Sequence, residues 1–339
     1  MSKILTRSIL AGSVGLVEVA TYGSNPSSSD PIAWVHASEF SVQEVVDTTA
    51  IETLAGPGSG GEGARFVTLV RAQGTVRVPI SYEDVGAWIE WAFGKDVATS
   101  GSGPYTHVYA TSPNTPFRTL VFVYTAADGT NLQDEFYGCQ VETAVFEFTA
   151  NGPAYMTLTV SGGVASRSST YQTGVAATET PAATSLVTSG VVLGSQGGAL
   201  SFNSNNMEAR TATLTLSRTL DRSTSFGAGG PDEGVLGSPI TATLAVERVA
   251  DEADTATLRT AFTAGTRAAL SLAFTSGTKS LTIAFTTASI TERNSGATPG
   301  AAKTESLTFS AQSLTTSDQI KITVVNSQSS GTPTNGTWA

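Results

Sequence analysis

The sequence predicts a mainly β protein made of two tandem units, each a β-sandwich or β-barrel with one flanking α-helix. The first observation is compositional: only 14% of the 339 residues are charged, whereas Thr, Ser, Gly and Ala abound. This composition favours half-buried strands joined by polar turns. The second observation is that the order of predicted elements occurs twice. Ile89 and Phe93 recur 169 residues later as Leu258 and Phe262, with an alanine between the members of each pair.

The first helix is predicted between Ser81 and Gly94, after the alternating run 75–80. Ser81 suits an N-cap, and Glu83 and Asp84 then lie in the first turn, where the helix dipole favours anions. Gly94 supplies the C-terminal stop. The apolar positions expected to pack against the sheet are Val85, Trp88, Ile89 and Phe93.

The second helix is predicted after the alternating run 240–246. It starts among acidic residues and ends at Phe262, with Gly265 beyond it. Leu258 and Phe262 stand four residues apart, so we expect both to pack against the sheet.

A strand hairpin follows each predicted helix. The first runs from Leu120 to Tyr124 and turns at Asp128-Gly129, and the second runs from Leu270 to Phe274 and turns at Ser276-Gly277. The returning and closing strands are expected at 137–141, 144–148 and 155–160 in the first unit and at 281–285, 307–309 and 320–324 in the second.

Two glycine-rich loops are predicted at matching places, residues 52–63 and 221–234, each following a strand, 40–45 and 212–216 respectively. Loops of this length inside a compact domain are commonly functional or disordered, and both alternatives stay open here. Neither loop has the Lys-Ser/Thr ending of a phosphate-binding loop, so no nucleotide cradle is predicted.

The predicted division of the chain follows from these elements. It comprises an N-terminal arm 1–35, a first unit 36–163, a linker 164–196, a second unit 197–326 and a flexible tail 327–339. The apolar run after Lys3 and Arg7 is short, diluted by glycine and serine, and closed by Glu18, so we interpret it as a β-arm or first strand and not as a cleaved signal. No stretch approaches the ~20 apolar residues of a membrane helix.

Composition and motifs give no catalytic, metal or cofactor site. The net charge of −10 excludes the basic footprint of a nucleic-acid-binding protein, and the single cysteine, Cys139, excludes an internal disulfide. His36 and His107 share no motif with Cys139, which we expect to be a small buried residue.

The acidic residues show no diagnostic spacing either. Asp128, Asp134 and Glu135 lack the alternating ligands of a calcium loop. Paired carboxylates of the kind used in glycoside hydrolysis, Glu142 with Glu147 and Glu83 with Glu90, arise easily in a chain with 28 acidic residues. We therefore predict that the protein is not an enzyme.

The order of strand, glycine-rich loop, strand, capped helix, hairpin and closing strands, written twice, resembles the tail tube proteins of long-tailed bacteriophages. The resemblance rests on 81–94 with its preceding strand, on the hairpin 120–141 and on the two loops. It implies a virion protein, made in the host cytoplasm, whose copies form stacked rings around the channel that DNA crosses. For a duplicated chain it implies trimeric rings with six domains. The stretch 95–118 and the more polar second helix, with Asp254 where the first has Val85, depart from the repeat.

The resemblance also implies partners. They are other copies of this chain, the tape-measure protein, the tail terminator and the baseplate or tip proteins, whereas DNA passes an acidic channel without specific binding. Contacts between rings are expected in the two loops, at Leu54, Gly58, Gly60, Glu62, Phe226, Gly229, Asp232 and Glu233.

The competing class of function is a binding module, namely a two-domain β-sandwich adhesin or carbohydrate-binding protein. Strands rich in Thr and Ser fit that class equally well. It predicts a functional signal sequence and a platform of aromatic side chains on one face.

Overall fold

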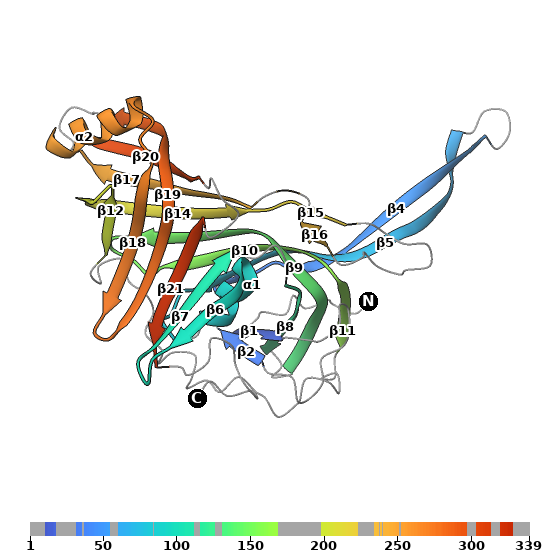
Figure 1. Cartoon of the computed structure of the whole chain (residues 1–339). Coiled ribbons are helices and arrows are strands. Elements are labelled where there is room, and N and C mark those ends of the chain that lie inside the picture. Colours follow the sequence, from blue (N-terminus) through green and yellow to red (C-terminus); the bar gives the residue numbers. More distant parts are fainter. Residues whose placement is uncertain are drawn as a thin grey trace.

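The computed structural model confirms that the protein is mainly β (Figure 1). It describes residues 11–17, 32–35, 37–54, 60–83, 85–111, 116–125, 131–168, 198–222, 234–236, 238, 240–250, 252–296, 303–312 and 319–327. The strands of the first half are β1 (Ala11–Val17), β2 (Ile32–Val35), β3 (Glu39–Phe40), β4 (Gln43–Leu54), β5 (Gly60–Pro79), β6 (Gly94–Ser100), β7 (Tyr105–Thr111), β8 (Arg118–Thr125), β9 (Asn131–Thr149), β10 (Tyr155–Gly162) and β11 (Val164–Ser168). Those of the second half are β12 (Ala199–Phe202), β13 (Asn205–Met207), β14 (Ala209–Ser217), β15 (Leu220–Asp221), β16 (Val235–Leu236), β17 (Thr241–Val249), β18 (Ala268–Ser276), β19 (Lys279–Gly296), β20 (Thr304–Ala311) and β21 (Ile320–Asn326).

Strands of both halves join into one antiparallel sheet. In its central run, β4, β5, β10, β9, β14, β17, β20 and β19 each pair with the next. The two halves meet where β9 pairs with β14, with Thr143 opposite Ser217 and Thr149 opposite Thr211. The halves are therefore joined by backbone hydrogen bonds as well as by the chain.

The repeat predicted from the sequence has a counterpart in the strand pairings. In the first half β4–β5, β5–β10, β10–β9, β9–β8, β8–β1 and β1–β2 are paired. In the second half β14–β17, β17–β20, β20–β19, β19–β18, β18–β12 and β12–β13 are paired in the same order. The division into domains 36–163 and 197–326 stays a prediction.

The predicted hairpins are confirmed as β8–β9 and β18–β19, and Gly277 adopts a φ of 61° in the second turn. The strands expected separately at 137–141 and 144–148 are one long strand, β9, and those expected at 281–285 continue to Gly296 in β19. One end of each long strand, β9 and β19, therefore belongs to the hairpin, and the other end belongs to the central run.

The stretch 95–118 that departs from the repeat forms most of a β-hairpin, β6–β7. Strand β7 then pairs with β21 of the second half, with Tyr105 opposite Asn326 and Ala110 opposite Lys321. The extra hairpin of the first half thus extends the sheet of the second half (Figure 1).

Strands lie inside both segments predicted to flank the first unit, while the domain boundaries themselves stay predictions. The N-terminal arm 1–35 contains β1 and β2, and β1 pairs with β8 along its whole length because Val14 and Leu16 are buried in the core. The linker predicted from 164 begins with a strand, β11, which pairs with β9 from Val164 to Ser168. The rest of the linker, 169–196, and residues 328–339 of the tail lie outside the described residues.

The first predicted loop is also wrong in most of its length. Glu52, Thr53 and Leu54 pair with Glu62, Gly61 and Gly60, so that β4 and β5 form one long hairpin that projects from the body (Figure 1). The residues at 48–51 and 66–70 are all β-branched or apolar, which favours this extension. At the second loop, β15 and β16 pair at the base, and 223–233 lies outside the described residues.

The first helix differs from its prediction at its start. Helix α1 (Gly86–Phe93) begins after Val85, without a side-chain cap, so Ser81 is not the N-cap and Glu83 precedes the helix. Its end at Gly94 is confirmed. Every residue of α1 except Glu90 is buried, because the short helix lies inside the fold and not over one opening of a sandwich.

The second helix, α2 (Glu252–Thr263), starts and ends as predicted, with Gly265 beyond it at a φ of 60°. Its buried positions are Leu258 and Ala261, three residues apart, whereas Phe262 is 37% exposed. The packing expected of Phe262 is therefore corrected to Ala261, since one side of α2 faces β19 and the remainder faces outward.

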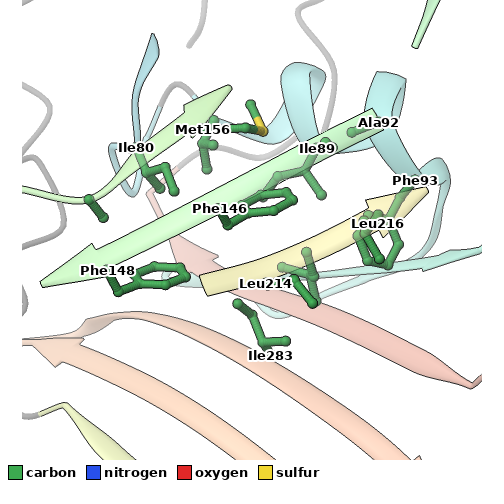
Figure 2. Packing of buried hydrophobic residues seen from close by; sticks show 14 of the residues in the cluster. Ile80, Ile89, Ala92, Phe93, Phe146, Phe148, Met156, Leu214, Leu216 and Ile283 are labelled. Carbon is green, nitrogen blue, oxygen red and sulfur yellow. The ribbon is translucent and has the colours of Figure 1, made fainter. Parts of the chain in front are cut away.

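The buried hydrophobic residues of both halves form one cluster. Figure 2 shows Ile89 of α1 beside Phe146 of β9, with Leu214 of β14 and then Ile283 of β19 beyond it. Along β14 the pattern is strictly alternating: Ala212, Leu214 and Leu216 are buried between half-exposed threonines and serine. The two halves are therefore joined by apolar side-chain packing as well as by backbone hydrogen bonds.

We expect Leu214→Ala to lower the free energy of unfolding by about 3 kcal/mol, because a fully buried leucine at the junction would leave a cavity. Urea unfolding followed by fluorescence measures the loss, with Thr213→Ala on the opposite face as control. Because the core is continuous, the curve should stay a single transition. Two separated transitions in the unsubstituted protein would contradict the continuous core.

Candidate assembly surfaces

The cysteine and the one described histidine are buried inside strands. Cys139 of β9 is inaccessible, and burial raises the pKa of its thiol to about 12. His107 of β7 is likewise buried, with Nδ1 3.1 Å from Thr99 Oγ1. His36 lies outside the described residues. Cys139 is therefore a small buried residue, as the sequence indicated.

The carboxylates considered for hydrolysis each have a partner in the fold. Ion pairs join Glu147 to Arg77 at 2.8 Å, Glu83 to Lys279 at 2.7 Å and Glu90 to Arg118 at 3.8 Å. Glu142 accepts a hydrogen bond from the Ser161 hydroxyl. These four acids are structural in this fold.

The structure describes two of the three acidic residues considered as calcium ligands. Glu135 is buried and accepts a hydrogen bond from the Tyr137 hydroxyl, whereas Asp128 lies outside the described residues. Within the described part of the chain, no three His, Cys, Asp or Glu side chains gather as metal ligands would. No described helix is long and apolar enough to cross a membrane.

One arginine of the second half caps the helix of the first. Arg218 follows β14, and its Nε donates to Val141 O at 2.8 Å while Nη2 donates to the carbonyls of Trp91 and Ala92 in the last turn of α1. A cation at a helix C-terminus satisfies carbonyls that have no partner within the helix. Burial lowers the pKa of Arg218 to about 10, so it stays charged at neutral pH.

A second contact fixes the C-terminal end of the described chain. The Glu83 carboxylate accepts hydrogen bonds from the backbone N–H and the hydroxyl of Ser327, besides its ion pair with Lys279 of β19. Asn326 Nδ2 donates to Tyr82 O at 2.9 Å. The end of β21 is therefore held against the segment that precedes α1.

The central run of the sheet leaves two edges open among the described residues. At one end, β3 and β4 pair only with β5. At the other, the C-terminal part of β19, from Ser289 to Gly296, pairs only with β20. An unpaired edge presents backbone donors and acceptors that another chain can engage.

The outer part of the β4–β5 hairpin, residues 46–54 and 60–70, is here called the arm. It carries three of the most exposed large hydrophobic side chains of the described residues, namely Val46 (45%), Phe66 (53%) and Val67 (62%). Apolar residues gathered on a projecting hairpin indicate a contact surface for another molecule. Sequence reasoning missed Phe66 and Val67, although both lie just after the glycine-rich stretch.

The residues predicted to contact a neighbouring ring are divided by the structure. Leu54 ends β4, while Gly60 and Glu62 belong to β5, at the outer end of the arm. Gly58, Phe226, Gly229, Asp232 and Glu233 lie outside the described residues. Of the predicted helix-packing residues, Val85, Trp88, Ile89, Phe93 and Leu258 are buried, and Phe262 is not.

One face of the central run is polar and is here called the threonine face. It alternates with the buried face along each strand, and among its members are Thr75 and Arg77 of β5, Thr157 and Thr159 of β10, Thr143 and Glu147 of β9, Thr213 and Thr215 of β14, Thr243 and Glu247 of β17, and Ser306 and Thr308 of β20. Arg77 pairs with Glu147 across the strands and lies 4.3 Å from the ring of Tyr155.

We expect Arg218→Ala to destabilise the protein by about 3 kcal/mol, because it leaves carbonyls of α1 and β9 without donors inside the fold. Thermal or urea unfolding measures the effect, and Arg210→Ala, at an exposed position of the same strand, is the matched control. Equal stability of the two variants would show that the cap contributes nothing.

Comparison with known protein families gives one match that covers most of the chain. A sequence model of the family described as phage tail tube protein matches residues 10–313. No curated protein matches the chain significantly. Because the match covers nearly the whole chain, from β1 into the region after β20, the protein is a structural component of the virion tail. The chain belongs to the phage tail tube protein family.

Proposed function

We propose that three copies of this chain close into a ring and that stacked rings form the hollow tail tube through which DNA passes. The observation that carries the proposal is the β9–β14 junction. There β9, the last strand of the first half's set, pairs with β14, the first strand of the second half's set. The central run ends in two open strands, β4 and β19, which are the counterparts of β14 and β9.

The number of chains follows from the repeat. Each half contributes four strands to the central run, β4, β5, β10 and β9 in the first and β14, β17, β20 and β19 in the second. The resemblance to tail tube proteins implies rings of six domains, and a chain with two domains supplies six from three copies. A closed ring also leaves no free strand edge.

The threonine face supports a channel role. A channel for DNA needs a hydrated surface without a basic patch, because Lys and Arg side chains bind phosphates. The described carboxylates on this face of the central run and its flanking strand β3 include Glu39, Asp47, Glu147, Glu247 and Glu292, against Arg71 and Arg77. This modest acidic excess repels DNA at short range while salt screens it beyond about 8 Å.

The arm supplies contact with the next ring in this proposal. Phe66 and Val67 are more than half exposed in a single subunit, and burying them against a neighbour would contribute hydrophobic free energy. The second-half loop with Phe226, Gly229, Asp232 and Glu233 stands at the equivalent place and is proposed as a shorter contact. The tape-measure protein, tail terminator and baseplate proteins are the further partners implied by the family.

The direct test of the proposed function is assembly of the purified protein. We expect concentrated protein to form rings and hollow tubes in negative-stain electron microscopy, because both edges then become paired. Size-exclusion chromatography over a range of concentrations supplies the matching measurement. Monomers alone, at every concentration and salt tested, would refute the proposed function.

The arm is tested separately by the double variant Phe66→Ser/Val67→Ser. We expect a folded subunit that still forms rings but forms few or no tubes, because the core and the sheet edges are untouched. Thr49→Ala, opposite Phe66 on the same arm, is the control. Tubes of normal length and salt resistance in the double variant would remove the arm from the contact between rings.

A further inference from the structure

An open pocket lies between α2 and the free part of β19. Its cationic lining residues are Arg259 of α2, Arg293 of β19 and Lys303, which precedes β20, and Thr255, Thr260 and Ser295 line it as well. No described residue that lines it carries a carboxylate. The charged residues in the described lining are therefore cationic, and the pocket borders an unpaired strand edge.

Arg293 is anchored from within the fold. The Glu305 carboxylate is fully buried and pairs with both Arg293 and the buried Arg248. Arg293 is thus held at the margin of the pocket by an ion pair with a buried carboxylate. A cation at the margin of an interface favours an acidic partner.

The internal repeat indicates which strand would pair with the free part of β19. In the first half, Leu158 of β10 pairs with Ala144 on one side and Val76 on the other. In the second half, Leu307 of β20 pairs with Arg293 and Val246 in the same way. The β-bulges of the two copies, at Glu142 in β9 and at Thr291 in β19, fix this alignment, so Arg293 occupies the position of Ala144.

The same ladder aligns β3 and β4 with β14. Val76 pairs with Phe40 of β3, and its counterpart Val246 pairs with Ala212 of β14. Glu44 lies four residues after Phe40, and Leu216 lies four residues after Ala212, so Glu44 occupies the position of Leu216. Leu216 pairs with Ala144 inside the chain. A junction between two chains that repeated this pairing would set Glu44 opposite Arg293.

We propose that the cationic pocket beside α2 receives the acidic edge strand of the next copy in the ring, with residues 41–45 of one copy antiparallel to 292–296 of the other and Glu44 opposite Arg293. This inference rests on the proposed ring and names the register of its junction. The incoming edge brings the Glu44 carboxylate to the cations of the pocket, whereas Glu39 and Asp47 of the same edge lie on the threonine face.

The difference between the two junctions has a physical reason. The junction inside the chain is always covered, and its facing side chains, Ala144 and Leu216, are buried and apolar. The edges that form the junction between chains face water until assembly, and an apolar edge would aggregate. Charges at the equivalent positions keep a free subunit soluble, and they become complementary only in the correct register.

Cysteine cross-linking tests the register without disturbing the charged cluster. Gln43 and Asn294 are exposed and fall opposite each other in the proposed register, so Gln43→Cys/Asn294→Cys should form disulfides between copies on mild oxidation of assembled protein. The control, Gln43→Cys/Glu292→Cys, shifts one partner by two residues on the same face. The native Cys139 is buried and does not compete.

The expected result is a ladder of linked dimers and trimers on a non-reducing gel, at least tenfold stronger for the 43/294 variant than for the 43/292 variant. Rings or tubes that form without the 43/294 link, or with an equal link in the control, would overturn this register and leave the proposed function standing. Unsubstituted protein that never forms rings would remove both.

A charge reversal gives an independent readout. Glu44→Arg should raise the protein concentration needed for assembly at least tenfold, because it faces Arg293 with a like charge, whereas Glu44→Gln, which removes the attraction without adding repulsion, should raise it by a smaller factor. Gln43→Arg, whose side chain lies on the other face, is the control. A Glu44→Arg protein that assembles like the unsubstituted one would contradict the proposed pairing.

Discussion

The pairing of backbone groups along strand edges is the constraint on which the rest of this structure depends. Each strand between β4 and β19 in the central run pairs with two neighbours, apart from the arm, where β5 pairs only with β4. Inside the chain, the pairing of β9 with β14 satisfies these backbone groups where the two halves meet. Arg218, which donates from the second half to α1 of the first, and the shared core make that junction rigid. A subunit built in this way is a preformed arc of sheet.

Much of the fold could be predicted because the repeat and the local signals agree. The strict alternation of β14, β17 and β18, the turn at Gly277 and the stops at Gly94 and Gly265 are visible in the sequence. The start of α1 could not be predicted, because Glu83 suits a first turn by propensity but pairs with Lys279, nearly two hundred residues away. The β7–β21 pairing likewise depends on contacts that no local pattern shows.

The candidate surfaces were predicted only in outline. The position of the first glycine-rich stretch was right, but glycine content suggested a loop where backbone pairing continues to Leu54 and Gly60. Phe66 and Val67 looked like ordinary strand residues, and their exposure depends on the arm leaving the body. The cationic pocket joins residues of α2, β19 and the segment before β20, which become neighbours only through tertiary packing.

The most direct measurement of the central claim is a cryo-electron microscopy reconstruction of assembled tubes. If the junction between chains repeats the β9–β14 junction, the map will contain three chains per ring and an unbroken sheet around the channel, with β4 of each copy beside β19 of the next. The threonine face will line that channel. Six chains per ring, or copies that meet without continuous strand pairing, would contradict the account.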